Sequence, residues 1–387
     1  MFYSGILDSM AGEGINPFDF NHPARAHELI NRRSELDVIM NLVWSGNNAR
    51  LAAPRRYGKT SLLLAAEREA DRKGFLPVHV DFYGALSDAD IANKIGTAYA
   101  AALTGKARQV FSSVIRRLNP TFRIGGGTIP SSVELGVKAN TPVLTELLEM
   151  PRRLHERSGQ RLLIVFDEFQ EVMNVGETAS LIRSVIQHHG DIASYVFAGS
   201  DVGMMRALFG DKRRPFYTQA APVPLPPLRP DDLIDYIGRK FDETGKDSAE
   251  GLEPVVDTAE GHPQRAMLLA YYLWDKTPLG GSATAETWAD AFDAAILYAI
   301  DEFARAWDDS SVTLRRLLTV IADNGRRLYA DDTGIRTGSG TTRALKTLIG
   351  RGDVVEDASK ATRHRLVDPL LASWIRSGRP IPSPPDR

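Results

Sequence analysis

The sequence Leu51-Ala52-Ala53-Pro54-Arg55-Arg56-Tyr57-Gly58-Lys59-Thr60-Ser61-Leu62-Leu63 decides the fold of this chain. It has the form of a turn between a short strand, residues 50–53, and a helix that runs from Ser61 to about Lys73. Its residues Gly58-Lys59-Thr60 match the end of the P-loop pattern, which is a glycine, four residues and then Gly-Lys-Ser/Thr. Ala53 stands where that pattern has its first glycine. The stretch is therefore a candidate phosphate-binding loop with one departure from the pattern.

The residue types of this loop suit the binding of a phosphate. Gly58 lets backbone N–H groups close around phosphate oxygens, because glycine leaves the backbone bare. Lys59 supplies a cation for the β- and γ-phosphates, and the Thr60 hydroxyl can bind Mg²⁺. The helix that follows points its N-terminus, with free N–H groups and the positive end of its dipole, at the same anion. From these residues alone, the alternative is an ordinary loop that contains Gly-Lys-Thr by chance.

Two apolar strands further along the chain end in polar residues. One spans residues 161–170 and ends in Asp167-Glu168, and the other spans residues 194–201 and ends at Ser200. Ligands of open α/β sheets bind at the carboxyl ends of the strands, so we expect these side chains beside the phosphate loop. Asp167 then holds Mg²⁺ together with Thr60, Glu168 polarises an attacking water as general base, and Ser200 senses the γ-phosphate. The alternatives are a solvated strand end at Asp167-Glu168 and a strand-end cap at Ser200.

The order of the expected elements divides the chain into four parts. Strands and helices alternate over residues 1–228, which predicts an α/β fold: a P-loop NTPase core of three layers, αβα, with a mostly parallel sheet. Within it, 105–142 is expected to be an insertion with a hairpin near 122–137, and 142–156 to be one helix. Residues 229–308 predict a helical lid subdomain, and residues 309–378, where helices precede two short strands, predict a winged helix-turn-helix. The Pro-rich tail 379–387 is expected to be disordered.

Composition and charge exclude several classes of protein. The 387 residues suit two or three domains, and 43% hydrophobic with 25% charged residues is ordinary for a globular protein. The sequence has no run of 18 apolar residues and no signal-like start, so we expect no membrane span and a cytoplasmic location. The absence of cysteine excludes disulfides, thiolate zinc sites and cysteine nucleophiles. Residues 311–387 carry a net charge of +6 and the remainder −8, which indicates an anionic partner for the C-terminal part or a chance imbalance on a solvated surface.

The motifs together resemble those of the archaeal-type P-loop ATPases of the STAND group, which are close to AAA+ proteins such as the Orc1/Cdc6-like initiators. The loop Ala53–Leu63 resembles the family's Pro-Arg-Arg-x-Gly-Lys-Thr-Ser-Leu segment. The resemblance implies a nucleotide site formed by residues 53–61, with Arg32 beside the adenine and Pro263 in the lid that reads the nucleotide. The other stretches that carry it are Asn31–Leu36, the Walker B segment Phe166–Gln170, the sensor 1 segment Ala198–Ser200, Gly261–Pro263, and Leu366–Leu370 with Trp374.

The chain departs from the family pattern in three places. Ala53 replaces the first glycine of the loop, which is tolerable where the φ angle stays negative. Arg265 lies one position away from the sensor 2 arginine of the initiators, which leaves open whether it reaches the γ-phosphate. Residues 105–142 have no role that the family suggests. Arg213 and Arg214 offer further contacts to a γ-phosphate, although a solvated loop fits their sequence better.

The sequence leaves three functions open. The first is an ATP-driven switch that binds ATP or ADP with Mg²⁺, hydrolyses ATP slowly and relays the nucleotide state to the winged helix. The second is a DNA-binding regulator that uses the helix 341–349, with Arg343 and Lys346, and the wing, with Arg363 and Arg365. The third is a nucleotide-binding protein without turnover, in which ADP clamps the domains. A protein partner or self-association is compatible with all three.

Overall fold

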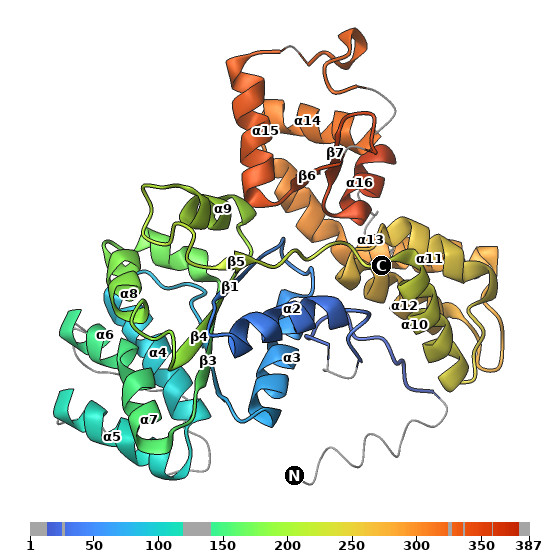
Figure 1. Ribbon diagram of the computed structural model, residues 1–387. Coiled ribbons are helices and arrows are strands. Elements are labelled where there is room, and N and C mark those ends of the chain that lie inside the picture. The colour runs from blue at the N-terminus through green and yellow to red at the C-terminus, as the bar shows by residue number, and fades with distance from the viewer. Residues whose placement is uncertain are drawn as a thin grey trace, which may run out of the picture. The chain divides into compact units, whose positions relative to one another are not determined.

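The structure is a computed structural model, and it describes residues 14–24, 28–118, 141–323, 327–335, 337–357 and 359–378. The chain divides into two compact units (Figure 1). The sheet unit comprises Arg25–Ala53 and Lys59–Leu225, and the helical unit comprises Met1–Ala24, Pro54–Gly58 and Pro226–Arg387. The hairpin expected near 122–137 and the tail from 379 lie outside the described residues.

The sheet unit is built on five parallel strands in the order β2-β3-β4-β1-β5. The prediction of an α/β fold with a parallel sheet is confirmed. Strand β4 lies between β1 and β3, so that Ala52 pairs with Gly199 and Phe166 with Phe197. The carboxyl ends of these three strands therefore meet at one edge of the sheet. The strands are β1 (Ala49–Ala52), β2 (Leu76–Asp81), β3 (Leu162–Asp167), β4 (Ala193–Gly199) and β5 (Ala221–Pro222).

Helices cover both faces of the sheet, and every residue of β3 and β4 is therefore buried. Helices α2 (Arg33–Trp44) and α3 (Lys59–Arg72) lie on one face (Figure 1). On the other face, alternate residues of β3, among them Ile164 and Phe166, enter a core that continues into the opposing helices. Those helices are α4 (Asp88–Ala102), α5 (Gly105–Leu118), α6 (Thr141–Leu148), α7 (Met150–Ser158) and α8 (Thr178–Ile186), and α9 (Val202–Gly210) follows β4.

The structure corrects one expected helix and has a helix at the start of the expected insertion. The single helix expected over 142–156 is two helices, α6 and α7, separated at Glu149. Pro151 lies in the first turn of α7 and has no N–H to donate to the preceding turn, so a continuous helix would lose a hydrogen bond and suffer a ring clash. The first part of the expected insertion is helix α5, and its Phe111 and Ile115 are fully buried in the core of the sheet unit.

Phenylalanine rings pack beneath the turn that follows β3. The ring of Phe169, in the 3₁₀ helix η2 (Phe169–Asn174), lies 5.7 Å from that of Phe166 and 4.8 Å from that of Phe197, centroid to centroid. Phe209 and Phe216 complete the cluster from α9 and the loop after it. These contacts hold the turn by apolar packing.

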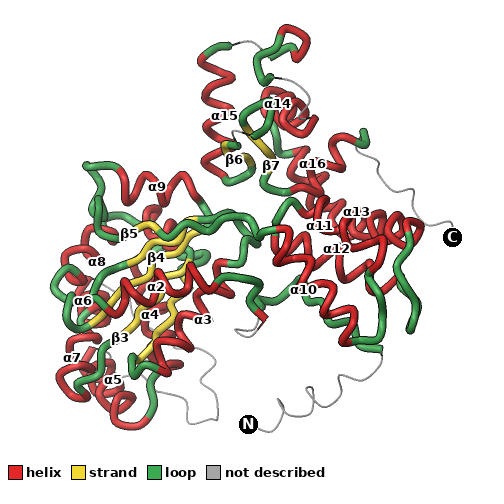
Figure 2. Tube along the Cα trace, turned by 45° about the vertical axis from the view of Figure 1, so that its right-hand side comes forward, coloured by secondary structure: helices red, strands yellow, loops and turns green. Residues whose placement is uncertain are grey.

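The helical unit contains four helices that lie side by side, α10 to α13 (Figure 2). A C-terminal segment follows, in which α14 packs against α15 and α16, and the antiparallel strands β6 and β7 lie between α15 and α16. No helix among the described residues is both long enough and apolar enough to cross a membrane. The elements are α10 (Pro230–Glu243), α11 (Leu252–Ala259), α12 (Pro263–Lys276), α13 (Ala285–Asp308), α14 (Val312–Asp323), α15 (Ser339–Arg351), β6 (Val354–Glu356), β7 (His364–Leu366) and α16 (Pro369–Arg376).

Candidate functional site

The conformation of the candidate phosphate loop explains its residues. Arg56 and Gly58 both have positive φ angles, 61° and 86°, and Ala53 is not among the residues with positive φ. The methyl group of Ala53 therefore causes no backbone strain in place of the pattern's first glycine. A Cβ atom at Gly58 would find nothing within 4 Å, so glycine is required there by its backbone angle, and the space beside it is open.

Lys59 is the first residue of α3, and its side chain is 5% exposed. Its Nζ donates a hydrogen bond to the carbonyl oxygen of Ala53 at 2.7 Å, across the base of the loop. Burial has the largest effect on the pKa of Asp167 and of Glu168, and the charge of Lys59 favours the ionised form of each carboxylate. The sheet unit thus brings the predicted lysine and the predicted carboxylates into one electrostatic neighbourhood.

The two carboxylates at the end of β3 have different environments. Burial is the largest influence on Asp167, and together with the negative charge of Glu168 it raises the pKa of Asp167. Burial also opposes ionisation of Glu168, but hydrogen bonds from Ser200 and Gln170 outweigh it and lower the pKa of Glu168. Glu168 Oε2 accepts from Ser200 Oγ at 2.6 Å and from Ser200 N at 3.2 Å. Ser200 therefore lies in the predicted site, where it contacts the predicted general base.

His79, which no motif of the sequence singles out, belongs to the same neighbourhood. Its Nδ1 lies 2.5 Å from Glu67 Oε1, and its Nε2 lies 4.0 Å from Asp167 Oδ2. Burial disfavours the imidazolium, but the hydrogen bond to Glu67 and the charges of Glu67, Asp167 and Asp81 raise the pKa of His79. The available signal was the period of two in β2, which places His79 on the same face as Asp81.

The tip of the loop, Pro54–Gly58, belongs to the helical unit. The Tyr57 side chain is 4% exposed, and its hydroxyl oxygen accepts a hydrogen bond from Arg365 Nη2 of β7 at 3.0 Å. The His262 ring lies edge-on to the Tyr57 ring, with 5.2 Å between centroids, and burial lowers the pKa of His262 to about 4. Arg56 Nη1 pairs with Glu302 Oε2 of α13 at 2.7 Å. Side chains from α13, from β7 and from the start of α12 therefore hold the loop tip.

Arg265, whose role the sequence left open, forms ion pairs inside the helical unit. Its side chain is 1% exposed, and its guanidinium pairs with Asp368 and Glu302. Asp368 also caps α16, where it accepts from the backbone N–H groups of Leu370 and Leu371. Burial opposes ionisation of Asp368, but the charge and hydrogen bonds of Arg265, with the smaller contributions of His262 and the Leu371 N–H group, together lower the pKa of Asp368. Arg265 thus joins α12, α13 and α16.

The structure places the remaining predicted nucleotide-site residues as follows. In the sheet unit, Arg32 is buried and pairs with Glu35 at 2.8 Å, and its Nη2 has no hydrogen-bond partner among the described residues. Thr60 is half-buried and Ser61 is buried at the start of α3. In the helical unit, Pro263 is half-buried in the first turn of α12, and Arg55 is exposed.

The basic residues predicted for other contacts fall into two groups. Arg343, Lys346 and Arg363 are exposed in the C-terminal segment, whereas Arg365 is engaged with Tyr57 and lies 3.4 Å from Asp357. In the sheet unit, Arg213 and Arg214 are exposed, and Arg213 pairs with Asp211 at 2.9 Å. The exposure of both arginines and this pairing within the loop agree with the interpretation of a solvated loop.

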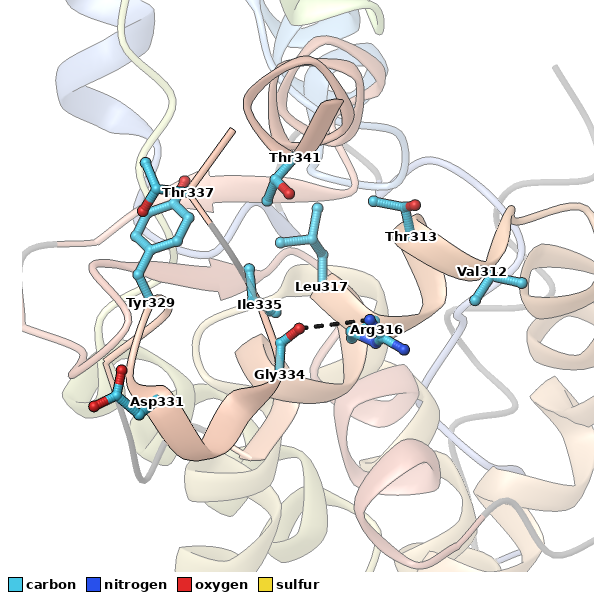
Figure 3. A pocket seen from close by; sticks show the side chains of 10 residues that line it. All are labelled: Val312, Thr313, Arg316, Leu317, Tyr329, Asp331, Gly334, Ile335, Thr337 and Thr341. Atoms are coloured by element: carbon cyan, nitrogen blue, oxygen red, sulfur yellow. Dashed lines mark hydrogen bonds between the residues drawn. The ribbon is translucent and has the colours of Figure 1, made fainter. Parts of the chain in front are cut away.

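The C-terminal segment contains a pocket of about 880 Å³ at the start of α14 and α15 (Figure 3). Arg316 projects into it from α14 and donates to the carbonyl oxygen of Gly334 at 3.5 Å. Thr341 of α15 lines the opposite side, with Tyr329 and Asp331 from the intervening loop. None of the residues predicted to bind nucleotide lines it.

The sheet topology and the loop define a P-loop NTPase fold. No protein-family model matches the chain, and no curated protein matches it. Among solved structures, the chain is similar to the Walker-type ATPase PABY2304 of Pyrococcus abyssi, with a TM-score of 0.67 and 17% identity over 93% of this chain and 99% of that one. It is also similar to the ORC2 protein of Aeropyrum pernix in its ADPNP–ADP complexes, with a TM-score of 0.57 and 15% identity over 93% and 97% of the two chains. The predicted likeness to archaeal Walker-type and Orc1/Cdc6-like ATPases is therefore confirmed for the fold.

Proposed function

We propose that the protein is an ATP-binding, slowly ATP-hydrolysing switch whose nucleotide state is relayed from the phosphate loop to a C-terminal winged helix. The observation that carries the proposal is the attachment of the loop tip: Tyr57 contacts Arg365 and His262, and Arg56 contacts Glu302. Lys59, which directly follows the loop tip, begins α3 of the sheet unit. A change at the phosphates would therefore act directly on side chains that contact β7 and α13.

The proposed domains follow the predicted boundaries. In this proposal residues 1–228 are the P-loop domain, of which Met1–Ala24, Pro54–Gly58 and 226–228 belong to the helical unit by their contacts. Residues 229–308 are the lid, and residues 309–378 are the winged helix, with the β6–β7 hairpin as the wing and α15 as the recognition helix. Nucleotide binds at the loop, and the first turn of α12, with Pro263, belongs to the lid that senses it.

The described residues fit a nucleotide with Mg²⁺. The space beside Gly58 is open, and the buried Arg32 retains a nitrogen without a partner among the described residues, so each leaves room or hydrogen-bonding capacity for a ligand. Thr60 and Asp167 would hold Mg²⁺, which supplies positive charge to the phosphate oxygens when it is bound. Lys59 and the loop N–H groups bind phosphate, Ser200 and Lys59 stand at the γ-phosphate side, and Glu168 accepts the proton of the attacking water.

Two measurements on the purified protein test this function. Extraction and chromatography identify any nucleotide that copurifies, and phosphate release from added MgATP measures turnover. Bound ATP or ADP with slow phosphate release supports the switch. Bound ADP without phosphate release favours the alternative in which ADP clamps the domains, and the absence of nucleotide binding contradicts both.

The relay predicts that Tyr57 and Arg365 act together. Tyr57→Phe removes the acceptor of the Arg365 hydrogen bond, and Arg365→Gln removes the charged donor. We expect each to weaken ADP binding by about three- to tenfold, because the loop loses a contact that preorganises it. The double variant is expected to bind ADP about as weakly as Arg365→Gln alone, because Tyr57→Phe removes only the hydrogen bond that Arg365→Gln already weakens, whereas Arg365→Gln also removes the pairing with Asp357.

Calorimetric titration of ADP into the wild-type protein, the two single variants and the double variant measures this coupling. Arg351→Gln, at an exposed position at the end of α15, is the matched control for loss of a surface arginine. Independent, additive losses would show that Tyr57 and Arg365 are not coupled, and would remove the support for the relay.

DNA binding by the winged helix is the second candidate. The observation that favours it is the exposure of Arg343 and Lys346, three positions apart on α15, together with Arg363 beside β7. We expect the affinity of the wild-type protein for duplex DNA to fall steeply as the salt concentration rises. We expect the double variant Arg343→Glu, Lys346→Glu to bind duplex DNA more weakly than the wild-type protein. Electrophoretic mobility shifts at two salt concentrations measure this, and no shift by the wild-type protein at low salt would end the proposal.

A further inference from the structure

Gln170 is a buried polar residue at the candidate site, and one of its polar atoms has no partner among the described residues. Its side chain is 4% exposed, and its Nε2 donates to Glu168 Oε2 at 2.5 Å. Its Oε1 is buried and has no hydrogen-bond partner among the described residues. A buried amide oxygen without a partner costs free energy, so packing at this position would favour an apolar side chain of similar size.

The amide can face Glu168 in one orientation only. Turning it over would place Oε1 against the carboxylate oxygen, where two acceptors repel each other, so the NH₂ group must face Glu168. The neighbouring strand leaves room for this arrangement, because a Cβ at Gly199 would lie 2.3 Å from Gln170 Oε1. Gly199 thus admits the amide that Gln170 presents.

The hydrogen bonds of the Glu168 carboxylate are distributed unevenly. Among the described residues, those that it accepts all fall on Oε2: from Gln170 Nε2, from Ser200 Oγ and from Ser200 N. The backbone of Glu168 has φ 49° and ψ 41°, an uncommon conformation for a residue with a side chain. Three donors and a fixed backbone therefore determine where Oε1 lies.

We propose that Gln170 is a positioning residue for the proposed ATP hydrolysis: with Ser200 it holds the Glu168 carboxylate by Oε2 and so directs Oε1 to the attacking water. The inference rests on the proposed ATPase function. Gln170 contacts neither nucleotide nor water in this role and acts only through Glu168. A residue that serves packing alone would lower stability when replaced, whereas a positioning residue lowers the rate.

The variants Gln170→Met and Gln170→Glu distinguish these roles. Gln170→Met keeps the size of the side chain and removes both the donor and the partnerless oxygen, so we expect an unchanged or higher melting temperature. We expect kcat to fall between about tenfold and about a hundredfold, with the Kd for ADP unchanged. Gln170→Glu places a second carboxylate against Glu168 and is expected to lower kcat further. Gln187→Met, at an exposed position after α8, is the matched control and keeps the wild-type kcat.

A double variant completes the test. In the Glu168→Gln background, Gln170→Met is expected to slow single-turnover phosphate release no further, because the group that it positions is already absent. Wild-type turnover by Gln170→Met, a melting temperature that falls with the rate, or additive losses in the double variant would each overturn the inference and leave the ATPase function standing. No phosphate release by the wild-type protein would overturn the proposed hydrolysis and this inference with it.

Discussion

Lys59→Ala is expected to abolish nucleotide binding. The Lys59 ammonium closes the base of the loop by its bond to Ala53 and is a cation near both Asp167 and Glu168. Its removal deletes the charge-assisted bonds to phosphate and leaves the two carboxylates to repel the incoming anion, so affinity should fall by about a hundredfold or more. Calorimetric titration with ATP and with ADP, both with Mg²⁺, measures the loss.

Two controls make that result specific to the site. Lys73→Ala removes an exposed lysine just beyond the other end of α3 and should bind nucleotide as the wild-type protein does. Circular dichroism of Lys59→Ala shows whether the fold is intact. A folded Lys59→Ala protein that binds ADP with wild-type affinity would contradict the assignment of the loop as a phosphate site.

Glu168→Gln is expected to retain nucleotide binding and lose turnover. Glutamine has the shape of glutamate, and its amide oxygen can accept the bonds from Ser200 that Oε2 accepts now. It cannot take a proton from water, so phosphate release should fall by about a hundredfold to about ten-thousandfold.

Single-turnover phosphate release with radiolabelled ATP measures this loss. Glu171→Gln, at a half-buried position three residues further along the chain, is the matched control and should release phosphate at the wild-type rate. Release at the normal rate by Glu168→Gln would show that Glu168 is not the base.

Short sequence patterns are sufficient to predict the buried strands and the phosphate loop. Runs of consecutive apolar residues predict two buried strands, and the structure has β3 and β4 at these positions. The Gly-Lys pair of the loop is recognisable within a few residues, and the glycine, Gly58, has a positive φ angle. Pro151 carried the signal that α6 and α7 are separate, because a proline in a helical pattern marks a boundary at about the preceding residue.

The contacts that define the site's surroundings are not local, and the sequence could not predict them. Tyr57 and Arg365 are separated by 308 residues, and Arg265 and Asp368 by 103. No spacing rule links residues so far apart: the sequence predicts DNA as the partner of Arg365 and leaves the partner of Arg265 open. The left-handed backbone of Glu168 and the packing of Gln170 against Gly199 of the neighbouring strand likewise have no local sequence pattern that predicts them.

The phenylalanine cluster beneath Asp167 and Glu168 has a consequence for motion during a reaction cycle. Interlocked aromatic rings in a close-packed interior shift little without breaking many contacts at once, so the turn that carries the carboxylates is a fixed reference frame. The loop tip, in contrast, has polar side-chain contacts, among them Arg56–Glu302 and Tyr57–Arg365, and the edge-on contact of Tyr57 with His262. If the proposed hydrolysis takes place, any displacement that accompanies it is therefore expected in the loop tip, while the Glu168 carboxylate stays in place.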